Sequence, residues 1–265
     1  VTDDDGDAPS AGERVATTVT SPEPPSAGEP ATERAGDKPS EQGDWVTRLN
    51  EQLHGAHPLS DLPPDLPAPD LQGWFDDGDV CKRLIESVRP EIMIEVGVWK
   101  GLSALRTLGW GLDQNPSCGL IAVDTWLGSS EHWIYADGRQ ALATQYGYPT
   151  LYRQFLANVA EQRMTDRIVP LPSTSSAAAN ILQYLGIQAD YVYIDAAHDG
   201  PGVAADIEAF WPIVRAGGVL VGDDYRPQFK GLRTEVDRFL TEGKSVADGR
   251  VERTKWYAIK AQAGQ

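Results

Sequence analysis

The feature of this sequence that most restricts its fold is a regular alternation of apolar and amphipathic segments. Five apolar runs predict buried strands: IMIEVGV, GLIAVDT, RIVPLPS, YVYIDAA and GGVLVGDDY. The stretches between them predict helices, among them residues 151–162 and 203–214, and a last helix near 230–240 precedes a final strand, KWYAIKA. Strands that alternate with helices form right-handed βαβ units and a mostly parallel sheet covered on both faces. We therefore predict an α/β, Rossmann-like doubly wound domain.

The start of the chain differs from this domain in composition. Residues 1–44 hold eleven acidic and three basic residues and show no apolar periodicity. Such a segment buries too little apolar surface to offset its ordering entropy, so we predict that residues 1–43 are disordered. Residues 44–75 are expected to form a helix, capped by Asp44 and ended by Gly55 and Pro58, and then a proline-rich connector. The α/β domain occupies residues 76–265.

Composition excludes several classes of function. The formal net charge is −16, and no basic stripe is present to neutralise phosphates, so nucleic acid is not an expected partner. No apolar run approaches the roughly 18 residues that a membrane span needs, and the acidic start is unlike a signal peptide. Cys81 and Cys118 lie in apolar segments and are expected to be buried, reduced thiols. These features favour a soluble, cytoplasmic protein.

The first strand leads into a glycine-containing turn, EVGVWKG. Gly97 and Gly101 allow a tight turn and a close approach of backbone to a ligand. Trp99 stands where the dinucleotide fingerprint needs a second glycine to admit a pyrophosphate. With Glu95 at the strand end, this turn favours a ligand that carries a cationic group and no pyrophosphate, such as S-adenosylmethionine. The alternative is an ordinary strand-to-helix turn that binds nothing.

Polar residues that could complete such a cofactor site end the next two strands. Asp124 follows Gly101 by 23 residues, a spacing at which an acidic residue can accept both ribose hydroxyls. Ser173 and Thr174 end the third strand and could reach an adenine edge. The alternative is that Asp124, Ser173 and Thr174 only cap a helix or a turn, as Asp, Ser and Thr commonly do.

Three carboxylates are expected to meet at the far ends of two neighbouring strands. Asp195 ends YVYID, and Asp223 and Asp224 end GGVLVGDD. Adjacent parallel strands lie about 4.8 Å apart, and crowded carboxylates raise each other's pKa unless a cation neutralises them. A hard divalent ion with oxygen ligands, Mg²⁺ above all, fits this set, and the absence of nearby cysteine disfavours zinc. The alternative is that these carboxylates cap loops and face water.

Two histidines are candidate bases. His198 follows Asp195 by three residues, so it would overlook the cation and could take a proton from a hydroxyl, unless it only orients its loop. His132 is the second candidate and lies in a long aromatic loop, residues 126–150, which is typical of a lid, a substrate-binding loop or a dimer contact. His132, Trp133 and Tyr225 are the candidate substrate contacts, and a homo-oligomer is possible.

Together, EVGVWKG, VDTW, YIDAAHD and GGVLVGDDY resemble the motifs of class I S-adenosylmethionine-dependent O-methyltransferases, over about residues 77–261. The resemblance is greatest to the metal-dependent branch, which includes catechol and macrolide-sugar enzymes. It implies a methyltransferase domain with a seven-stranded sheet whose last strand is antiparallel. It implies cofactor contacts at Glu95, Gly97, Ser103 and Asp124, and ligation of Mg²⁺ by Asp195, Asp223 and Asp224. Our further candidate cofactor contacts are Trp99, Gly101, Ser173 and Asp195.

The resemblance also bears on the acceptor. Catechol enzymes carry a lysine at the position of His198, and some sugar enzymes carry a histidine there. We therefore predict Mg²⁺-dependent methyl transfer to a carbohydrate hydroxyl, with the 1-hydroxyl of a 3-O-methylmannoside as one such acceptor, and with His198 and Asp195 as the catalytic residues. The alternatives are a phenol, catechol or macrolide-sugar O-methyltransferase, a binding protein that has lost catalysis, and a nicotinamide-dependent dehydrogenase.

Overall fold

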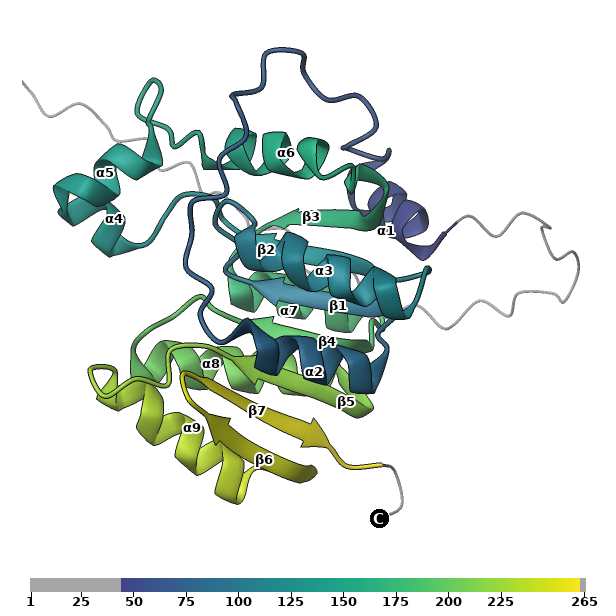
Figure 1. Cartoon of the computed structure of the whole chain (residues 1–265), viewed down its shortest axis with the longest axis vertical. Helices are drawn as coiled ribbons and strands as arrows, with labels where there is room; N and C mark the ends of the chain where they lie inside the picture. The colour runs from purple at the N-terminus through teal and green to yellow at the C-terminus, as the bar shows by residue number, and fades with distance from the viewer. Residues whose placement is uncertain (1–43, 263–265) are drawn as a thin grey trace, which may run out of the picture. The chain divides into compact units, whose positions relative to one another are not determined.

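Seven strands form one mixed sheet in the order β3-β2-β1-β4-β5-β7-β6 (Figure 1). The computed structural model describes residues 44–262, so the disordered segment predicted at residues 1–43 lies outside the described residues. The strands are β1 (Ile92–Val96), β2 (Gly119–Asp124), β3 (Ile168–Pro172), β4 (Ala189–Ile194), β5 (Val214–Gly222), β6 (Val246–Glu252) and β7 (Lys255–Lys260).

The pairing of these strands confirms the predicted fold class. β1 to β5 are parallel, whereas β7 runs antiparallel to both β5 and β6. Every residue of β4, the sequence ADYVYI, is buried, because helices cover both faces of the sheet. The seven-stranded α/β sheet with an antiparallel β7 is that of class I methyltransferases.

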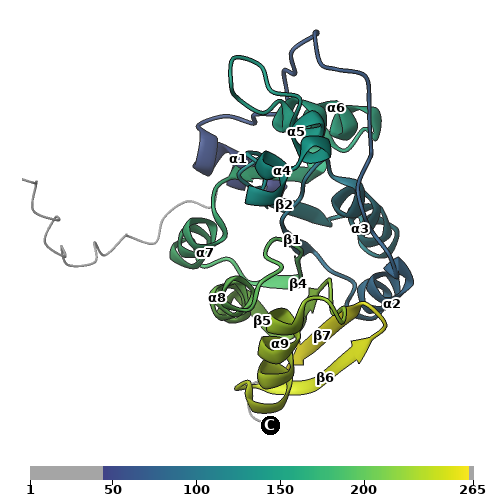
Figure 2. The ribbon, with the colours of Figure 1, turned by 90° about the vertical axis from the view of Figure 1, so that its left-hand side faces the viewer.

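Helices form the two outer layers, which Figure 2 shows on either side of the strands. One apolar core lies between the sheet and α2 (Gly78–Val88), α3 (Leu102–Gln114) and α6 (Leu151–Glu161). The second lies between the sheet and α1 (Trp45–His54), α7 (Ser175–Tyr184), α8 (Gly200–Phe210) and α9 (Lys230–Glu242). Cys81 and Cys118 are free and buried, as expected, and burial raises their pKa values to about 11 and about 12. None of the helices within residues 44–262 is both long and apolar enough to cross a lipid bilayer.

The structure corrects several expected elements. β6 does not appear among the apolar runs, because it is an edge strand with the polar sequence VADGRVE and few buried residues. The long aromatic loop contains two short helices, α4 (Ser130–Ile134) and α5 (Ala136–Leu142). The helix expected at 203–214 spans Gly200–Phe210, because the Asp199 side chain accepts a hydrogen bond from the amide of Gly202 and starts the helix earlier.

The N-terminal helix and connector pack on the domain. Asp44 makes no capping bond, and its carboxylate instead accepts a hydrogen bond from Arg167 at 2.9 Å. The connector is bonded to α6 at Asp70. The buried side chain of Asn158 in α6 donates to the carbonyl of Asp70 and accepts from the amide of Asp70, both at 2.8 Å. The Lys100 ammonium bonds the Asp70 carboxylate at 2.6 Å. These bonds hold the connector against the glycine turn.

Candidate active site

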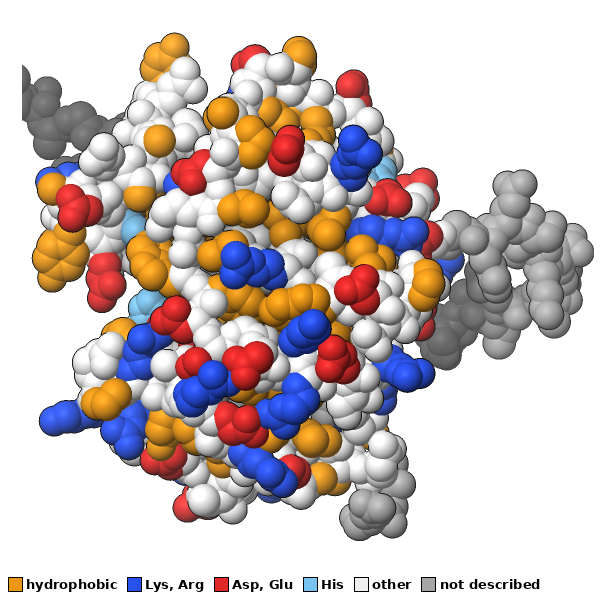
Figure 3. Space-filling model, in the orientation of Figure 1, with side chains coloured by type: hydrophobic (Ala, Val, Ile, Leu, Met, Phe, Trp, Pro, Cys, Tyr) orange, Lys and Arg blue, Asp and Glu red, His pale blue; other side chains and the backbone are white. Residues whose placement is uncertain are grey.

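A cavity of about 570 Å³ opens at the carboxyl ends of β1, β2, β4 and β5. The strand order reverses between β1 and β4, and parallel sheets bind ligands at such a switch point. The volume lies within the range of small-molecule sites. Figure 3 shows the molecular surface from one side, with a notch between the α4–α5 segment and the part of the molecule that carries α8 and α9.

The glycine turn after β1 is shaped by contacts inside the protein. Gly97 has a φ of +89°, and a Cβ at this position would lie 2.2 Å from the carbonyl oxygen of Asp195. Gly101, with a φ of +92°, precedes α3, and its amide donates to the carbonyl of Val98. Gly97 therefore lets the ends of β1 and β4 approach each other, and Gly101 makes the predicted tight turn.

Glu95 and Ser103 form a buried pair below this turn. The Ser103 hydroxyl donates to Glu95 Oε1 at 2.6 Å, whereas Oε2 has no hydrogen-bond partner among the described residues. Glu95 is fully buried, and burial raises the pKa of its carboxyl group well above the usual value. Ser103 lines the cavity and Glu95 does not.

Asp124 organises the neighbouring loops. Its Oδ2 accepts from the amide of Trp99 at 2.8 Å and its Oδ1 from the amide of Trp126 at 2.7 Å. Burial raises the pKa of this carboxyl group, against the effect of the backbone hydrogen bonds. Both tryptophans have a positive φ, 53° and 51°, which is unusual for bulky residues. Asp124 thus acts as a turn residue, and it also lines the cavity.

The end of β3 completes this side of the cavity. Ser173, Thr174 and Ser175 line it, and the Ser173 amide donates to the Asp124 carbonyl at 3.0 Å. Thr174 is the N-cap of α7, because its hydroxyl accepts from the amide of Ala177. The helix-capping alternative is therefore correct for Thr174.

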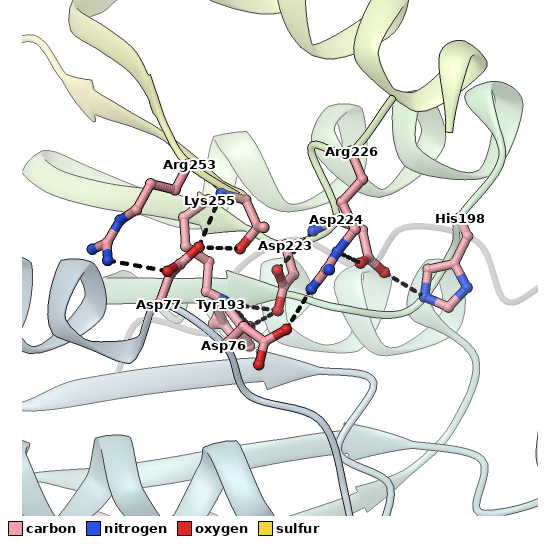
Figure 4. A network of polar contacts seen from close by, with 10 residues as sticks. Asp76, Asp77, Tyr193, His198, Asp223, Asp224, Arg226, Arg253 and Lys255 are labelled. Atoms are coloured by element: carbon pink, nitrogen blue, oxygen red, sulfur yellow. Dashed lines mark hydrogen bonds and ion pairs between the residues drawn. The ribbon is translucent and has the colours of Figure 1, made fainter. Parts of the chain in front are cut away.

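An acidic cluster forms the opposite wall, and we call Asp195, His198 and Asp224 the DHD cluster. One side-chain oxygen or nitrogen from each lies within 4.8 Å of the others. His198 Nε2 is 3.0 Å from Asp224 Oδ2 (Figure 4). Burial, together with the nearby carboxylates of Asp223 and Asp224, raises the pKa of Asp195 to about 7. The cluster therefore places two carboxylates and an imidazole together at the ends of β4 and β5.

Within this cluster, His198 and Asp224 influence each other's protonation. The hydrogen bond to Asp224 raises the pKa of His198, and burial opposes it. Burial would raise the pKa of Asp224, but His198 and Arg226 outweigh it and lower this pKa. The His198 ring also stacks on Phe229, with ring centroids 5.3 Å apart.

Asp223, the third predicted metal ligand, is placed differently. It is 8% exposed, and its carboxylate bonds the hydroxyl of Tyr193 and the ammonium of Lys255 (Figure 4). The sequence predicted that the carboxylates of Asp195, Asp223 and Asp224 would lie together. In the structure Asp195 and Asp224 lie beside His198, whereas Asp223 bonds Lys255.

The candidate substrate contacts are not equally placed. His132 lines the cavity and stacks on Trp99, with ring centroids 4.4 Å apart. Its Nδ1 accepts a hydrogen bond from the amide of Ser129 at 3.0 Å, which leaves the neutral ring its proton on Nε2 and makes His132 a poor base. Neither Trp133 nor Tyr225 lines the cavity: Trp133 donates to the carbonyl of Leu127, and Tyr225 to Asp237.

Sequence reasoning missed several residues of the cavity. Gly73 and Trp74 of the connector line it, and so does Asp76, the first residue of the α/β domain. Arg226 lines it too, and its guanidinium bridges Asp224 at 3.0 Å and Asp76 at 2.8 Å (Figure 4). In the sequence, only the position of Arg226 two residues after Asp224 pointed to a place in the site. In the connector, only the aromatic residues pointed to a contact with a ligand.

Comparisons with known proteins agree with the fold. Two solved structures with a similar fold are the O-methyltransferase from Bacillus cereus in complex with SAH and cofactor-bound Rv0187 from MTB. The first is 16% identical with a TM-score of 0.50, and the match covers 81% of this chain and 89% of that chain. The second is 16% identical with a TM-score of 0.51, and the match covers 81% of this chain and 95% of that chain. A search of curated proteins finds no match.

A family profile gives the stronger result. Residues 94–225, about half of the chain, match the family described as a methyltransferase domain. The match runs from β1 through the acidic pair after β5, so it includes the glycine turn, Asp124 and the DHD cluster. Residues 94–225 therefore form a methyltransferase domain, and the chain is an S-adenosylmethionine-dependent enzyme with the class I fold.

Proposed function

We propose that this enzyme is an O-methyltransferase that acts on a hydroxyl of a carbohydrate and uses Mg²⁺ at the acceptor. The observation that carries the proposal is the DHD cluster, which shares one cavity with the glycine turn and Asp124. A methyltransferase needs no metal to hold its cofactor. An acidic cluster with a histidine, placed beside the cofactor loops, is therefore best explained by the acceptor.

The residues around the glycine turn fit S-adenosylmethionine, which supplies an activated methyl group on a sulfonium when bound. Asp124 and Ser173 lie beside each other in the cavity wall, where they could contact the ribose and the adenine. Glu95 Oε2, which has no hydrogen-bond partner among the described residues, lies buried next to Ser103 at the cavity wall. Gly97, Trp99 and Gly101 would shape the loop that faces the cofactor.

The DHD cluster fits a divalent cation. Asp195 and Asp224 offer oxygen atoms, which Mg²⁺ prefers, and a cation between them would stabilise the charged form of Asp195, whose pKa is raised by burial and by the neighbouring carboxylates. We propose that Asp195 and Asp224 hold Mg²⁺, which would polarise the acceptor hydroxyl.

We assign the proton transfer to His198. Asp224 bonds Nε2, which orients the ring and stabilises its charged form, so the other ring nitrogen, Nδ1, is the site that accepts the hydroxyl proton. The stack on Phe229 holds the ring plane.

The walls of the cavity suit a sugar. Trp74, Trp99, His132 and Phe229 give flat ring faces around polar side chains. A phenol or catechol would also fit such walls, and the histidine at position 198 is what favours the sugar. In its narrowest form the proposed acceptor is the 1-hydroxyl of a 3-O-methylmannoside, the reaction of the mycobacterial methylmannose polysaccharide 1-O-methyltransferase. The acidic, alanine- and proline-rich start of the chain, which is typical of actinobacterial proteins, supports this form.

The test is a methyl-transfer assay with a panel of acceptors. We expect S-adenosylhomocysteine to form with 3-O-methylmannosides and Mg²⁺, and turnover to fall by roughly 100-fold or more with EDTA and to return with Mg²⁺. Turnover with catechol but not with sugars would replace the acceptor class. Full turnover in EDTA would remove the cation from the proposal.

A further inference from the structure

We propose that Lys255 and Tyr193 hold Asp223 as an internal counter-ion that positions Asp224, so that Asp224 and not Asp223 faces the cation. The cation itself rests on the proposed function. The pairing of Asp223 with Lys255 rests on contacts alone.

Both oxygens of the Asp223 carboxylate are used inside the protein. Oδ2 accepts a hydrogen bond from the Tyr193 hydroxyl at 2.7 Å and another from the Lys255 ammonium. Oδ1 accepts from the backbone amide of Asp224 at 2.7 Å. Figure 4 shows these contacts on the side of Asp223 that faces Lys255, with the Asp224 carboxylate directed toward His198. Asp223 also lines the cavity, but its carboxylate could rotate toward a cation only by breaking these bonds.

Among residues 44–262, Lys255 forms an ion pair with Asp223 alone. It begins β7 and is 0% exposed. Its ammonium donates to the Tyr193 hydroxyl at 2.9 Å and lies 5.0 Å from the ring centroid of Phe75 and 5.3 Å from that of Tyr193. These rings are favourable neighbours for a cation but do not replace a carboxylate. If Asp223 turned away, a buried ammonium would lose its counter-ion, which is strongly unfavourable.

Asp223 also fixes the conformation of the next residue. Asp224 has a φ of +59°, a region that costs free energy for a residue with a side chain. The hydrogen bond from its amide to Asp223 Oδ1 stabilises that conformation. As a result the two consecutive carboxylates point apart, and that of Asp224 reaches His198 Nε2 and Arg226 Nε, each at 3.0 Å.

The pairing sets the charge that the cavity presents. Without Lys255, the carboxylates of Asp195, Asp223 and Asp224 would repel one another at one edge of the sheet. Lys255 neutralises one of the three and leaves Asp195 and Asp224 beside His198. Lys255 and Asp223 therefore position the carboxylate of Asp224, and Asp224 is the ligand of the cation.

The first arm of the test measures unfolding temperatures in metal-free buffer. Lys255→Met should lower the unfolding temperature by about 10 °C, because it strands a buried carboxylate. Addition of Asp223→Asn to this variant should recover at least half of the loss, because it removes that charge and keeps the oxygen that bonds the Asp224 amide. Equal losses for the single and the double variant would show that Lys255 does not neutralise Asp223.

The second arm measures Mn²⁺ binding by calorimetry on the full chain. The Asp223→Asn/Lys255→Met variant should bind within about threefold of the wild type, and Asp224→Asn roughly tenfold or more weakly. Asp223→Ala/Lys255→Met, which lacks the oxygen for the Asp224 amide, should also lose affinity by roughly tenfold. This last variant separates positioning from simple charge balance.

The outcomes of the second arm are distinct. A double Asn/Met variant as weak as Asp224→Asn would make Asp223 a ligand and overturn the proposal, and equal binding by the Asn/Met and Ala/Met variants would overturn the positioning role. A wild type that binds no Mn²⁺ would contradict the cation in the proposed function, and with it the ligand role of Asp224. The unfolding temperatures would then decide the pairing by themselves.

Discussion

Replacement of His198 by alanine should lower methyl-transfer turnover by about 10²–10⁴-fold, the usual contribution of a general base. His198 bonds Asp224 at 3.0 Å and lines the cavity that also holds Asp195 and Asp124. His132 cannot replace it, because its Nδ1 accepts from Ser129. Affinity for S-adenosylhomocysteine should stay near that of the wild type, since His198 contacts Asp224 and Phe229 and not the glycine turn. The loss of turnover and the unchanged affinity for S-adenosylhomocysteine can be measured on the same preparation, by a methyl-transfer assay and by calorimetry.

A histidine outside the cavity provides the control. His54 is exposed on α1, where it bonds the carbonyl of Pro170, and His54→Ala should leave turnover unchanged. A His198→Ala enzyme that keeps full turnover would end the assignment of the base. A His198→Ala enzyme that loses both turnover and Mn²⁺ affinity would show that His198 is a ligand of the cation, because His198 belongs to the DHD cluster.

Replacement of Gly97 by alanine should destabilise the protein by about 3 kcal/mol or more and abolish cofactor binding. The added Cβ would lie 2.2 Å from the carbonyl oxygen of Asp195 and 2.8 Å from the Cα of Ala196, and both are backbone atoms that a rotamer change cannot move. The left-handed φ of +89° adds to the cost. The ends of β1 and β4 must separate, which displaces Asp195. Urea unfolding and titration with S-adenosylhomocysteine measure the two effects.

Gly55 is a matched control for this substitution. It also has a positive φ, +76°, but a Cβ there would meet nothing within 4 Å. Gly55→Ala should therefore cost about 1 kcal/mol and leave cofactor affinity unchanged. Similar losses of stability for the two variants would mean that the contact between Gly97 and Asp195 is unimportant.

The parts of the fold that could be predicted are those with a local signal. Buried parallel strands carry continuous apolar runs, so β1 to β5 were visible, and polar residues after such strands predicted where Asp124, Asp195 and Asp224 would lie. β6 carries no such run, because an edge strand has little to bury. The two short helices of the aromatic segment depend on a capping box between Ser129 and His132, which is too weak a signal in sequence.

The parts that could not be predicted depend on contacts between distant segments. Two consecutive aspartates after β5 look equivalent in sequence. In the structure they differ because Asp223 bonds the ammonium of Lys255, which is 32 residues away along the chain. The same holds for Arg226 and Asp76, which are 150 residues apart. Such pairs depend on the register of β5 against β7 and on the path of the connector, neither of which has a local pattern.

The measurement that tests the central claim most directly is a calorimetric titration of a 3-O-methylmannoside into the enzyme saturated with S-adenosylhomocysteine, with and without Mg²⁺. We predict that the demethylated cofactor binds metal-free protein and that the sugar then binds only when Mg²⁺ is present. Sugar binding that is the same without Mg²⁺ would contradict the role of Asp195 and Asp224 at the acceptor. Failure of the demethylated cofactor to bind would contradict the assignment of the cavity as a methyl-transfer site.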